Sequence, residues 1–167
     1  IHLTHSVIWC DEGEHLLLAR ALNNGMFPYK DFFTLKWPGM VFLLAMVFST
    51  LGDSVGVAKG TILVLDILVV FCTYLLSKNI TTTRFALLSA LFCMFGLVLF
   101  EGTSIMTEQC AVLFGLLSLL LFIRFAKSGR RYYLVLTGIA LFVSIFTKQQ
   151  AIIFAVTIVI ASLVYTI

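Results

Sequence analysis

Charged residues are scarce in this chain. Lysine, arginine, aspartate and glutamate together make up 11% of its 167 residues, whereas hydrophobic residues make up 61%. The mean hydropathy of +1.10 lies far above that of soluble globular domains. The composition therefore excludes an ordinary soluble domain and predicts a protein embedded in a membrane.

A cysteine framework is also lacking. The four cysteines form no Cys-x-x-Cys pair, and Cys72 and Cys93 fall within apolar runs, where cysteine acts as a small apolar residue. One alternative remains, a disulfide between Cys10 and Cys110, because spacing alone cannot supply the geometry of a bridge. The chain shows no internal repeat and no low-complexity tract.

Five apolar stretches are candidate membrane spans, because each approaches the roughly 20 residues that a helix needs to cross the bilayer core. These stretches are 60–77, 85–100, 109–123, 132–147 and 149–167. The shorter run 39–51 is typical of an interfacial or re-entrant helix. We therefore expect an all-α fold, a polytopic transmembrane bundle of five helices in 56–167. An external loop, 1–55, would carry two short interfacial helices.

The loops between these stretches differ in charge. One set holds six basic residues and no acid: Lys78, Arg84, Arg124, Lys127, Arg130 and Arg131. The positive-inside rule places this set in the cytoplasm and the acidic N-terminal loop outside the cell or in an organelle lumen. The net charge of +3 resides in these cytoplasmic loops, so it does not indicate nucleic-acid binding.

Asp66 is the only acid within a predicted span. A bundle-facing carboxylate bonded to a neighbouring helix explains it most simply. A proton or ion relay is the alternative, although we expect no second buried ionisable residue to accompany it in the spans.

Three acids crowd together near the start of the chain: Asp11, Glu12 and Glu14. The pattern predicts a short helix over 11–24, with Asp11 as N-cap and Gly25 just beyond its end. Capping explains Asp11 and Glu14 but leaves Glu12 without a role. A metal pair that includes His15 is a further alternative, although the leading histidine of a zincin helix is missing.

Three lysines follow on the same side, at Lys30, Lys36 and Lys59. Such lysines commonly anchor a protein to lipid headgroups by extending toward them. The alternative is that they converge on an anionic phosphate, for which lysine is a competent point charge.

A set of short elements resembles the GT-C glycosyltransferases, in the branch of dolichyl-phosphate-mannose protein mannosyltransferases and aminoarabinose transferases. The elements are Asp11-Glu12, Tyr29-x-Asp31, Lys36-x-Pro38, Thr107-Glu108 and Thr147-Lys148. The resemblance runs from Trp9 to about Phe154. It implies two membrane-parallel helices, at about 11–24 and 38–51, and one span before the acidic pair. We therefore expect a fragment of a longer GT-C module with one span missing upstream.

The resemblance implies that a sugar moves from a polyprenyl-phosphate donor to an acceptor protein, lipid or glycan on the extracytoplasmic or lumenal face. Asp11 would be the catalytic base and Glu12 its neighbour in the acidic pair. Lys36 would bind the donor phosphate, together with Lys59, which stands where relatives usually carry Arg. Trp37, where relatives often have Pro, is a second departure from the family pattern.

Four further residues would face the cavity by the same resemblance: Tyr29, Asp31, Glu108 and Lys148. For Glu108 and Lys148, complementing a helix dipole or anchoring a span end is an equal alternative.

Sugar transfer needs a carboxylate to take the acceptor proton and positive charge to stabilise the departing phosphate. A single displacement without an enzyme nucleophile predicts inversion at the anomeric carbon.

We assign no cofactor and no metal site, and a divalent cation that assists the reaction is left as an alternative. Two other functions are weighed, an ion-coupled transporter or flippase and a non-catalytic membrane subunit. Membrane lipids are expected partners, nucleic acid is not, and we favour the plasma membrane over the endoplasmic reticulum.

Overall fold

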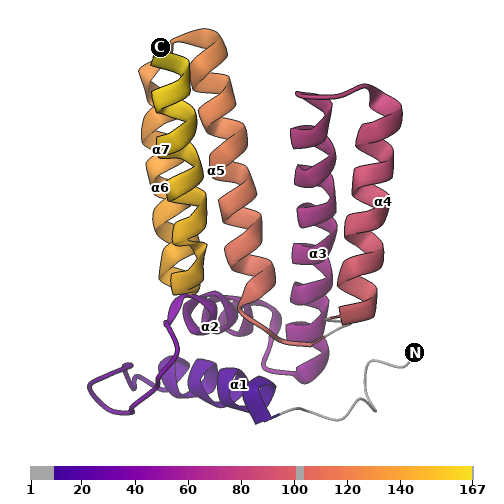
Figure 1. Ribbon diagram of the computed structural model, residues 1–167. Helices are drawn as coiled ribbons and strands as arrows, with labels where there is room; N and C mark the ends of the chain where they lie inside the picture. The colour runs from indigo at the N-terminus through magenta and orange to yellow at the C-terminus, as the bar shows by residue number, and fades with distance from the viewer. Residues whose placement is uncertain (1–9, 101–103, 167) are drawn as a thin grey trace.

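The computed structural model describes residues 10–100 and 104–166 (Figure 1). The described residues are helical apart from turns, loops and one isolated bridge between Pro28 and Phe32, which confirms the all-α prediction. The elements are α1 (Cys10–Asn23), α2 (Gly39–Leu51), α3 (Val55–Lys78), α4 (Thr83–Phe100), α5 (Glu108–Ser128), α6 (Arg131–Thr147), the 3₁₀ turn η1 (Gln149–Ala151) and α7 (Ile152–Thr166).

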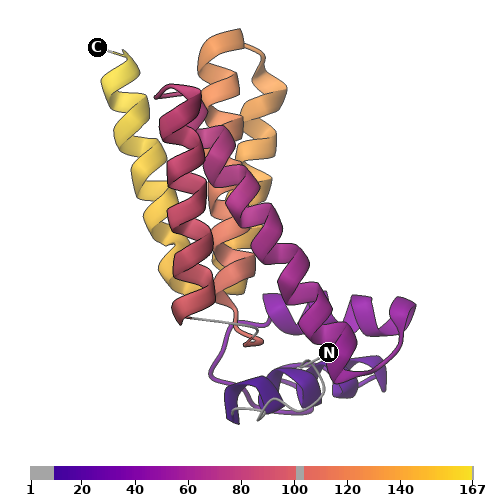
Figure 2. The ribbon, with the colours of Figure 1, turned by 90° about the vertical axis from the view of Figure 1, so that its right-hand side faces the viewer.

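The helices form two layers. Helices α3 to α7 stand side by side, and α1 and α2 lie across one end of them, packed on each other (Figures 1 and 2). Helix α5 is central, because it packs against both α3 and α6. The two short helices fall where the sequence predicts interfacial helices; that they lie in the plane of a membrane stays a prediction.

Two helices, α3 and α5, are long and apolar enough to cross a membrane. Helices α4, α6 and α7 coincide with the other three predicted spans but are shorter, so their crossing stays a prediction. Helix α3 begins at Val55, before the predicted start at Gly60, because Ser54 caps it: its Oγ accepts a hydrogen bond of 3.1 Å from the Val57 N–H.

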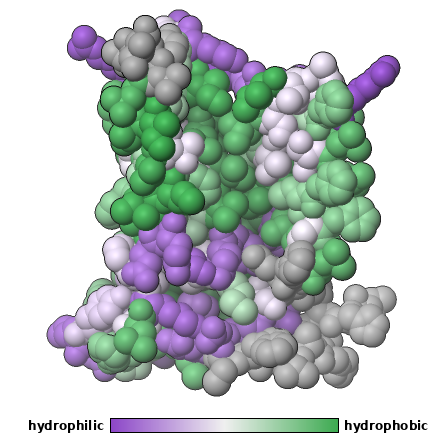
Figure 3. All heavy atoms as spheres, in the orientation of Figure 1, coloured by the Kyte–Doolittle hydropathy of each residue, from purple (hydrophilic) through white to green (hydrophobic). Residues whose placement is uncertain are grey.

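A buried core joins the two layers. It is built from apolar side chains of α1, α2, α3 and α5, among them Leu16, Met40, Leu44, Phe48, Ile62 and Leu113. Farther along the upright helices, large apolar side chains point outward, and Figure 3 shows hydrophobic residues gathered there while hydrophilic ones gather around α1 and α2. Phe92 and Phe142, for example, are 74% and 65% exposed. An apolar surface of this extent suits contact with lipid.

Helix α1 begins at Cys10, one residue before its predicted start. Asp11 therefore lies in the first turn rather than at the N-cap, where its carboxylate still complements the helix dipole. The helix ends at Asn23, and Gly25 follows with a φ of 84°, as expected for the glycine beyond a helix end.

The structure also decides one alternative and leaves another open. Cys110 is a free thiol whose Sγ lies 3.7 Å from the Thr147 Oγ1, so the disulfide between Cys10 and Cys110 is wrong. Asp66 is half-buried beside an apolar cavity of about 530 Å³ between α3 and α4. Both interpretations of this carboxylate remain predictions.

Gly39 lets the start of α2 approach the end of α6. A Cβ atom at this position would lie 2.7 Å from the Thr147 Cα, which is too close for any side chain. We expect Gly39→Ala to lower the free energy of unfolding by about 1–3 kcal/mol, because α2 must move away from α6. Thermal unfolding in detergent measures this. Gly60→Ala is the control, since its Cβ would meet no atom within 4 Å, and equal effects of the two variants would contradict the account.

Candidate active site

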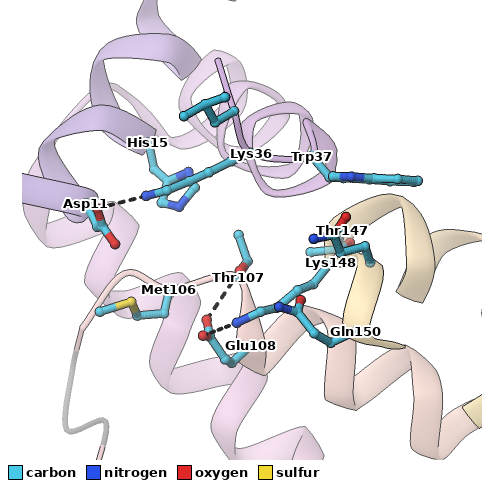
Figure 4. Close-up of a pocket in the computed structure, with 12 residues that line it drawn as sticks. Asp11, His15, Lys36, Trp37, Met106, Thr107, Glu108, Thr147, Lys148 and Gln150 are labelled. Atoms are coloured by element: carbon cyan, nitrogen blue, oxygen red, sulfur yellow. Dashed lines mark hydrogen bonds and ion pairs between the residues drawn. The ribbon is translucent and has the colours of Figure 1, made fainter. Parts of the chain in front are cut away.

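A polar cavity of about 190 Å³ lies where the two layers meet (Figure 4). Four segments reach it: the start of α1, the loop before α2, the start of α5, and the turn after α6. Their polar side chains that line the cavity are Asp11, His15, Lys36, Thr107, Glu108, Thr147, Lys148, Gln149 and Gln150. Residues far apart in the sequence thus form one site.

Lys36 pairs with two carboxylates of α1. Its Nζ lies 3.0 Å from the Asp11 Oδ1 and 3.2 Å from the Glu14 Oε2. Burial alone would lower the pKa of Lys36, but the hydrogen bonds to these two acids outweigh it and raise the pKa above its ordinary value. Lys36 is therefore a permanent positive charge in the cavity.

The loop that carries Lys36 is fixed by its own hydrogen bonds. The Thr34 Oγ1 donates to the Glu14 Oε1 at 3.1 Å and accepts from the Lys36 N–H at 3.1 Å. The Tyr29 hydroxyl donates to the Lys36 carbonyl oxygen at 3.0 Å. These contacts place the lysine over α1 before any ligand binds.

A second ion pair, between Lys148 and Glu108, lies across the cavity. Glu108 is the first residue of α5 and also accepts a hydrogen bond of 3.2 Å from the Thr107 Oγ1. Lys148 directly follows α6. Each residue suits the dipole of its own helix and also faces the cavity, so the two interpretations of the sequence are compatible.

The acidic pair divides between two environments. The side chain of Asp11 is 57% exposed and lines the cavity, whereas Glu12 is 1% exposed and does not line it. The Glu12 Oε1 accepts a hydrogen bond of 2.8 Å from the Ile105 N–H. Neighbouring residues of a helix face different directions, so one acid serves the cavity while the other fixes the segment before α5.

Three other predicted site residues lie outside the lining. Tyr29 and Asp31 are exposed in the loop between α1 and α2, where the Asp31 Oδ2 accepts a hydrogen bond of 2.8 Å from the Phe27 N–H. Lys59 is 2% exposed, within α3. Trp37, the departure from the family pattern, does line the cavity.

His15 lines the cavity and is buried, which the sequence alone does not predict. It is 2% exposed, and its Nδ1 has no hydrogen-bond partner among the described residues. Burial lowers the pKa of His15, and the positive charge of Lys36 lowers it further, so the imidazole is neutral at pH 7. The spacing of four residues from Asp11 already predicts a shared helix face. No group of three potential ligands in the described part of the chain is arranged to hold a metal.

The lowered pKa of His15 predicts a dependence of stability on pH. Its pKa in the folded protein lies below the ordinary histidine value of 6.5, so the unfolded chain binds the proton first as pH falls. The stability that depends on neutral His15 is therefore fully present above about pH 6.5 and is lost as pH falls through the pKa of His15 in the folded protein. We expect His15→Gln to reduce this loss in thermal unfolding between pH 7 and 5. An unchanged pH profile would contradict the assignment.

A comparison with family models supplies a match. The model of the dolichyl-phosphate-mannose-protein mannosyltransferase family matches residues 36–167, a range that contains Lys36, Glu108 and Lys148. Searches of curated proteins and of solved structures gave no match. The matched range covers most of the chain and confirms the family, and two of the five short elements, Asp11-Glu12 and Tyr29-x-Asp31, lie before it. This chain therefore belongs to the dolichyl-phosphate-mannose-protein mannosyltransferase family, whose members are membrane glycosyltransferases of the GT-C type.

Proposed function

We propose that the polar cavity is where a sugar passes from a polyprenyl-phosphate donor to an acceptor hydroxyl. The observation that carries the proposal is the convergence of Asp11, Lys36 and Lys148 on one cavity from three separate segments. This set combines a carboxylate with two positive charges, which is what the transfer requires.

Asp11 is the base in this proposal. It takes the proton of the acceptor hydroxyl as the acceptor oxygen bonds to the anomeric carbon. The bond from that carbon to the phosphate oxygen breaks at the same time, and its electron pair leaves with the polyprenyl phosphate. One displacement of this kind inverts the anomeric centre.

Lys36 and Lys148 are the phosphate-binding groups. The donor is a phosphodiester, and its phosphate gains a second negative charge when the sugar departs, so fixed positive charge favours the transition state over the bound donor. Carboxylates hold both lysines while the cavity is empty. The phosphate would replace Asp11 beside Lys36 and leave that carboxylate free to accept a proton.

An apolar cavity next to the polar one offers a place for the polyprenyl chain. It has a volume of about 320 Å³ and shares Glu108, Lys148 and Gln150 with the polar cavity. Its remaining lining is mainly apolar and comes from α5, η1 and α7, including Val112, Ile153 and Phe154. A lipid whose phosphate contacts Lys148 would extend its chain along these residues.

The proposal keeps 1–55 as an external region with α1 and α2 at the membrane surface, and 56–167 as the membrane-spanning region. The acceptor face is then extracytoplasmic or lumenal. The predominance of basic residues at the opposite end of the helices supports this orientation.

The test uses membrane vesicles that contain the protein, supplied with labelled polyprenyl-phosphate sugars and candidate acceptors. We expect donor consumption together with a product whose anomeric configuration is opposite to that of the donor. Retention of configuration would contradict the single displacement. Sugar transfer that does not consume a lipid-phosphate donor would contradict the donor assignment.

A further inference from the structure

Another cavity lies at the opposite end of the upright helices from the candidate active site. It has a volume of about 280 Å³ and is lined by residues of α3, α5 and α6 and by Asn79, just after α3. Its walls are leucine side chains, Leu75, Leu117, Leu120 and Leu121. Walls of this kind suit a hydrocarbon chain and not a small ion.

The rest of the lining is polar. It consists of Arg124 in the last turns of α5, Tyr133 near the start of α6, and Asn79. The Asn79 Oδ1 accepts a hydrogen bond of 2.7 Å from the Lys127 Nζ, so that lysine is held at this end of the helices by a neutral amide. A guanidinium, a phenol and an ammonium group thus lie at or beside one end of an apolar groove.

This end of the molecule carries uncompensated positive charge. Six basic residues gather in its loops and helix ends, whereas the described acids lie at the other end or, for Asp66, within α3. Within the described part of the chain, the carboxylates that form ion pairs, Asp11, Glu14, Asp53 and Glu108, all lie at the far end. Basic pockets between membrane helices favour anionic lipid headgroups.

We propose that this groove binds an anionic phospholipid, with the phosphate at Arg124 and one acyl chain against the leucines. The positive charge at this end favours an anionic headgroup, and the leucine walls favour a lipid over free phosphate. The groove lies between α3 and the packed pair of α5 and α6, so a bound lipid braces α3 against this pair, from which α3 diverges toward this end (Figure 1). The site is separate from the polar cavity and does not depend on sugar transfer.

The test is native mass spectrometry of the purified protein in detergent, titrated with phosphatidylglycerol or phosphatidylcholine. We expect phosphatidylglycerol to remain bound and to raise the unfolding temperature, as any ligand of the folded state does. Phosphatidylcholine should do neither, and inorganic phosphate should not displace the lipid. Equal binding of the two phospholipids, or displacement by phosphate, would overturn the proposal.

Variants then locate the site. Arg124→Gln should weaken phosphatidylglycerol binding by about tenfold or more, because it removes a charge-assisted hydrogen bond. Arg84→Gln is the matched control: it removes the same charge at the same end but lies on α4, outside the groove. Equal losses in both variants would mean general surface attraction and would refute a groove site.

Leu121→Trp tests the chain-binding walls without any change of charge. The larger side chain fills the groove, so phosphatidylglycerol binding should fall although Arg124 is intact. Unchanged binding would contradict the placement of the acyl chain. Circular dichroism and the unfolding temperature without lipid establish that each variant is folded.

Discussion

Asp11→Asn is expected to lower sugar transfer by about 10²- to 10⁴-fold, the range that a positioned general base contributes. Asparagine has nearly the same shape but cannot take a proton from the acceptor hydroxyl. The measurement is consumption of labelled polyprenyl-phosphate sugar in vesicles that contain equal amounts of the two proteins.

The folding of this variant should change little. Asp11 lies in the first turn of α1 and is exposed, so its charge contributes at most about 1 kcal/mol through the helix dipole and the ion pair with Lys36. Glu14→Gln is the matched control, because Glu14 is the second carboxylate on the same lysine but does not line the polar cavity. Full turnover by Asp11→Asn would reduce Asp11 to a structural acid and direct attention to Glu108.

Lys36→Ala is expected to lower kcat/KM for the lipid donor by about 10²- to 10³-fold, the loss typical of removing one group that stabilises developing charge. The phosphate that departs from the sugar would lose its positive partner in the loop before α2. Initial rates measured over a range of donor concentrations separate this effect from a loss of folded protein.

Lys30→Ala provides the control for this second prediction. Lys30 belongs to the same loop and carries the same charge, but it is exposed and does not line the cavity. Anchoring to lipid headgroups would make the two lysines equivalent, whereas phosphate binding makes only Lys36 important. Unchanged donor dependence in Lys36→Ala would contradict its assigned role.

The positions of most helices can be predicted from the sequence because local signals determine them. Gly25 and Gly52 mark helix ends, Pro38 precedes α2, and Ser54 caps α3. The alternation of apolar and charged stretches then separates the remaining helices. These signals act over a few residues, and the tertiary contacts of this protein agree with them.

The site can be predicted only in part from the sequence, because its geometry depends on contacts between segments that are distant in the chain. The sequence treats Asp11 and Glu12 as one pair, but the hydrogen bond from Ile105 turns Glu12 into a buried anchor. No local pattern in the sequence predicts that Glu12 accepts a hydrogen bond from a residue as distant as Ile105. Lys59 is similar: the family resemblance places it near the donor phosphate, whereas it is buried within α3 and does not line the polar cavity.

His15 illustrates the opposite case. Its spacing from Asp11 predicts a shared helix face, but burial and the nearness of Lys36 arise only when the loop before α2 folds over α1. Charge and exposure at this position are therefore tertiary properties. The pH dependence of stability measures them directly.

The two competing functions make different demands on the chain. A transporter built around Asp66 would need coupled buried charges along α3 and α4, but the other residues that line the cavity beside Asp66 are apolar. A non-catalytic subunit would tolerate Asp11→Asn and Lys36→Ala alike. The membership of the chain in a glycosyltransferase family favours catalysis over both.

Photo-crosslinking tests most directly whether the polar cavity holds the donor. The probe is a polyprenyl-phosphate sugar with a photoreactive diazirine on the isoprene unit next to the phosphate, activated in vesicles and mapped by peptide mass spectrometry. The account predicts labelling of 35–37, 106–112 and 147–154 that excess unlabelled donor abolishes. Competed labelling confined to α3 and α4 would place the donor elsewhere and contradict the central claim.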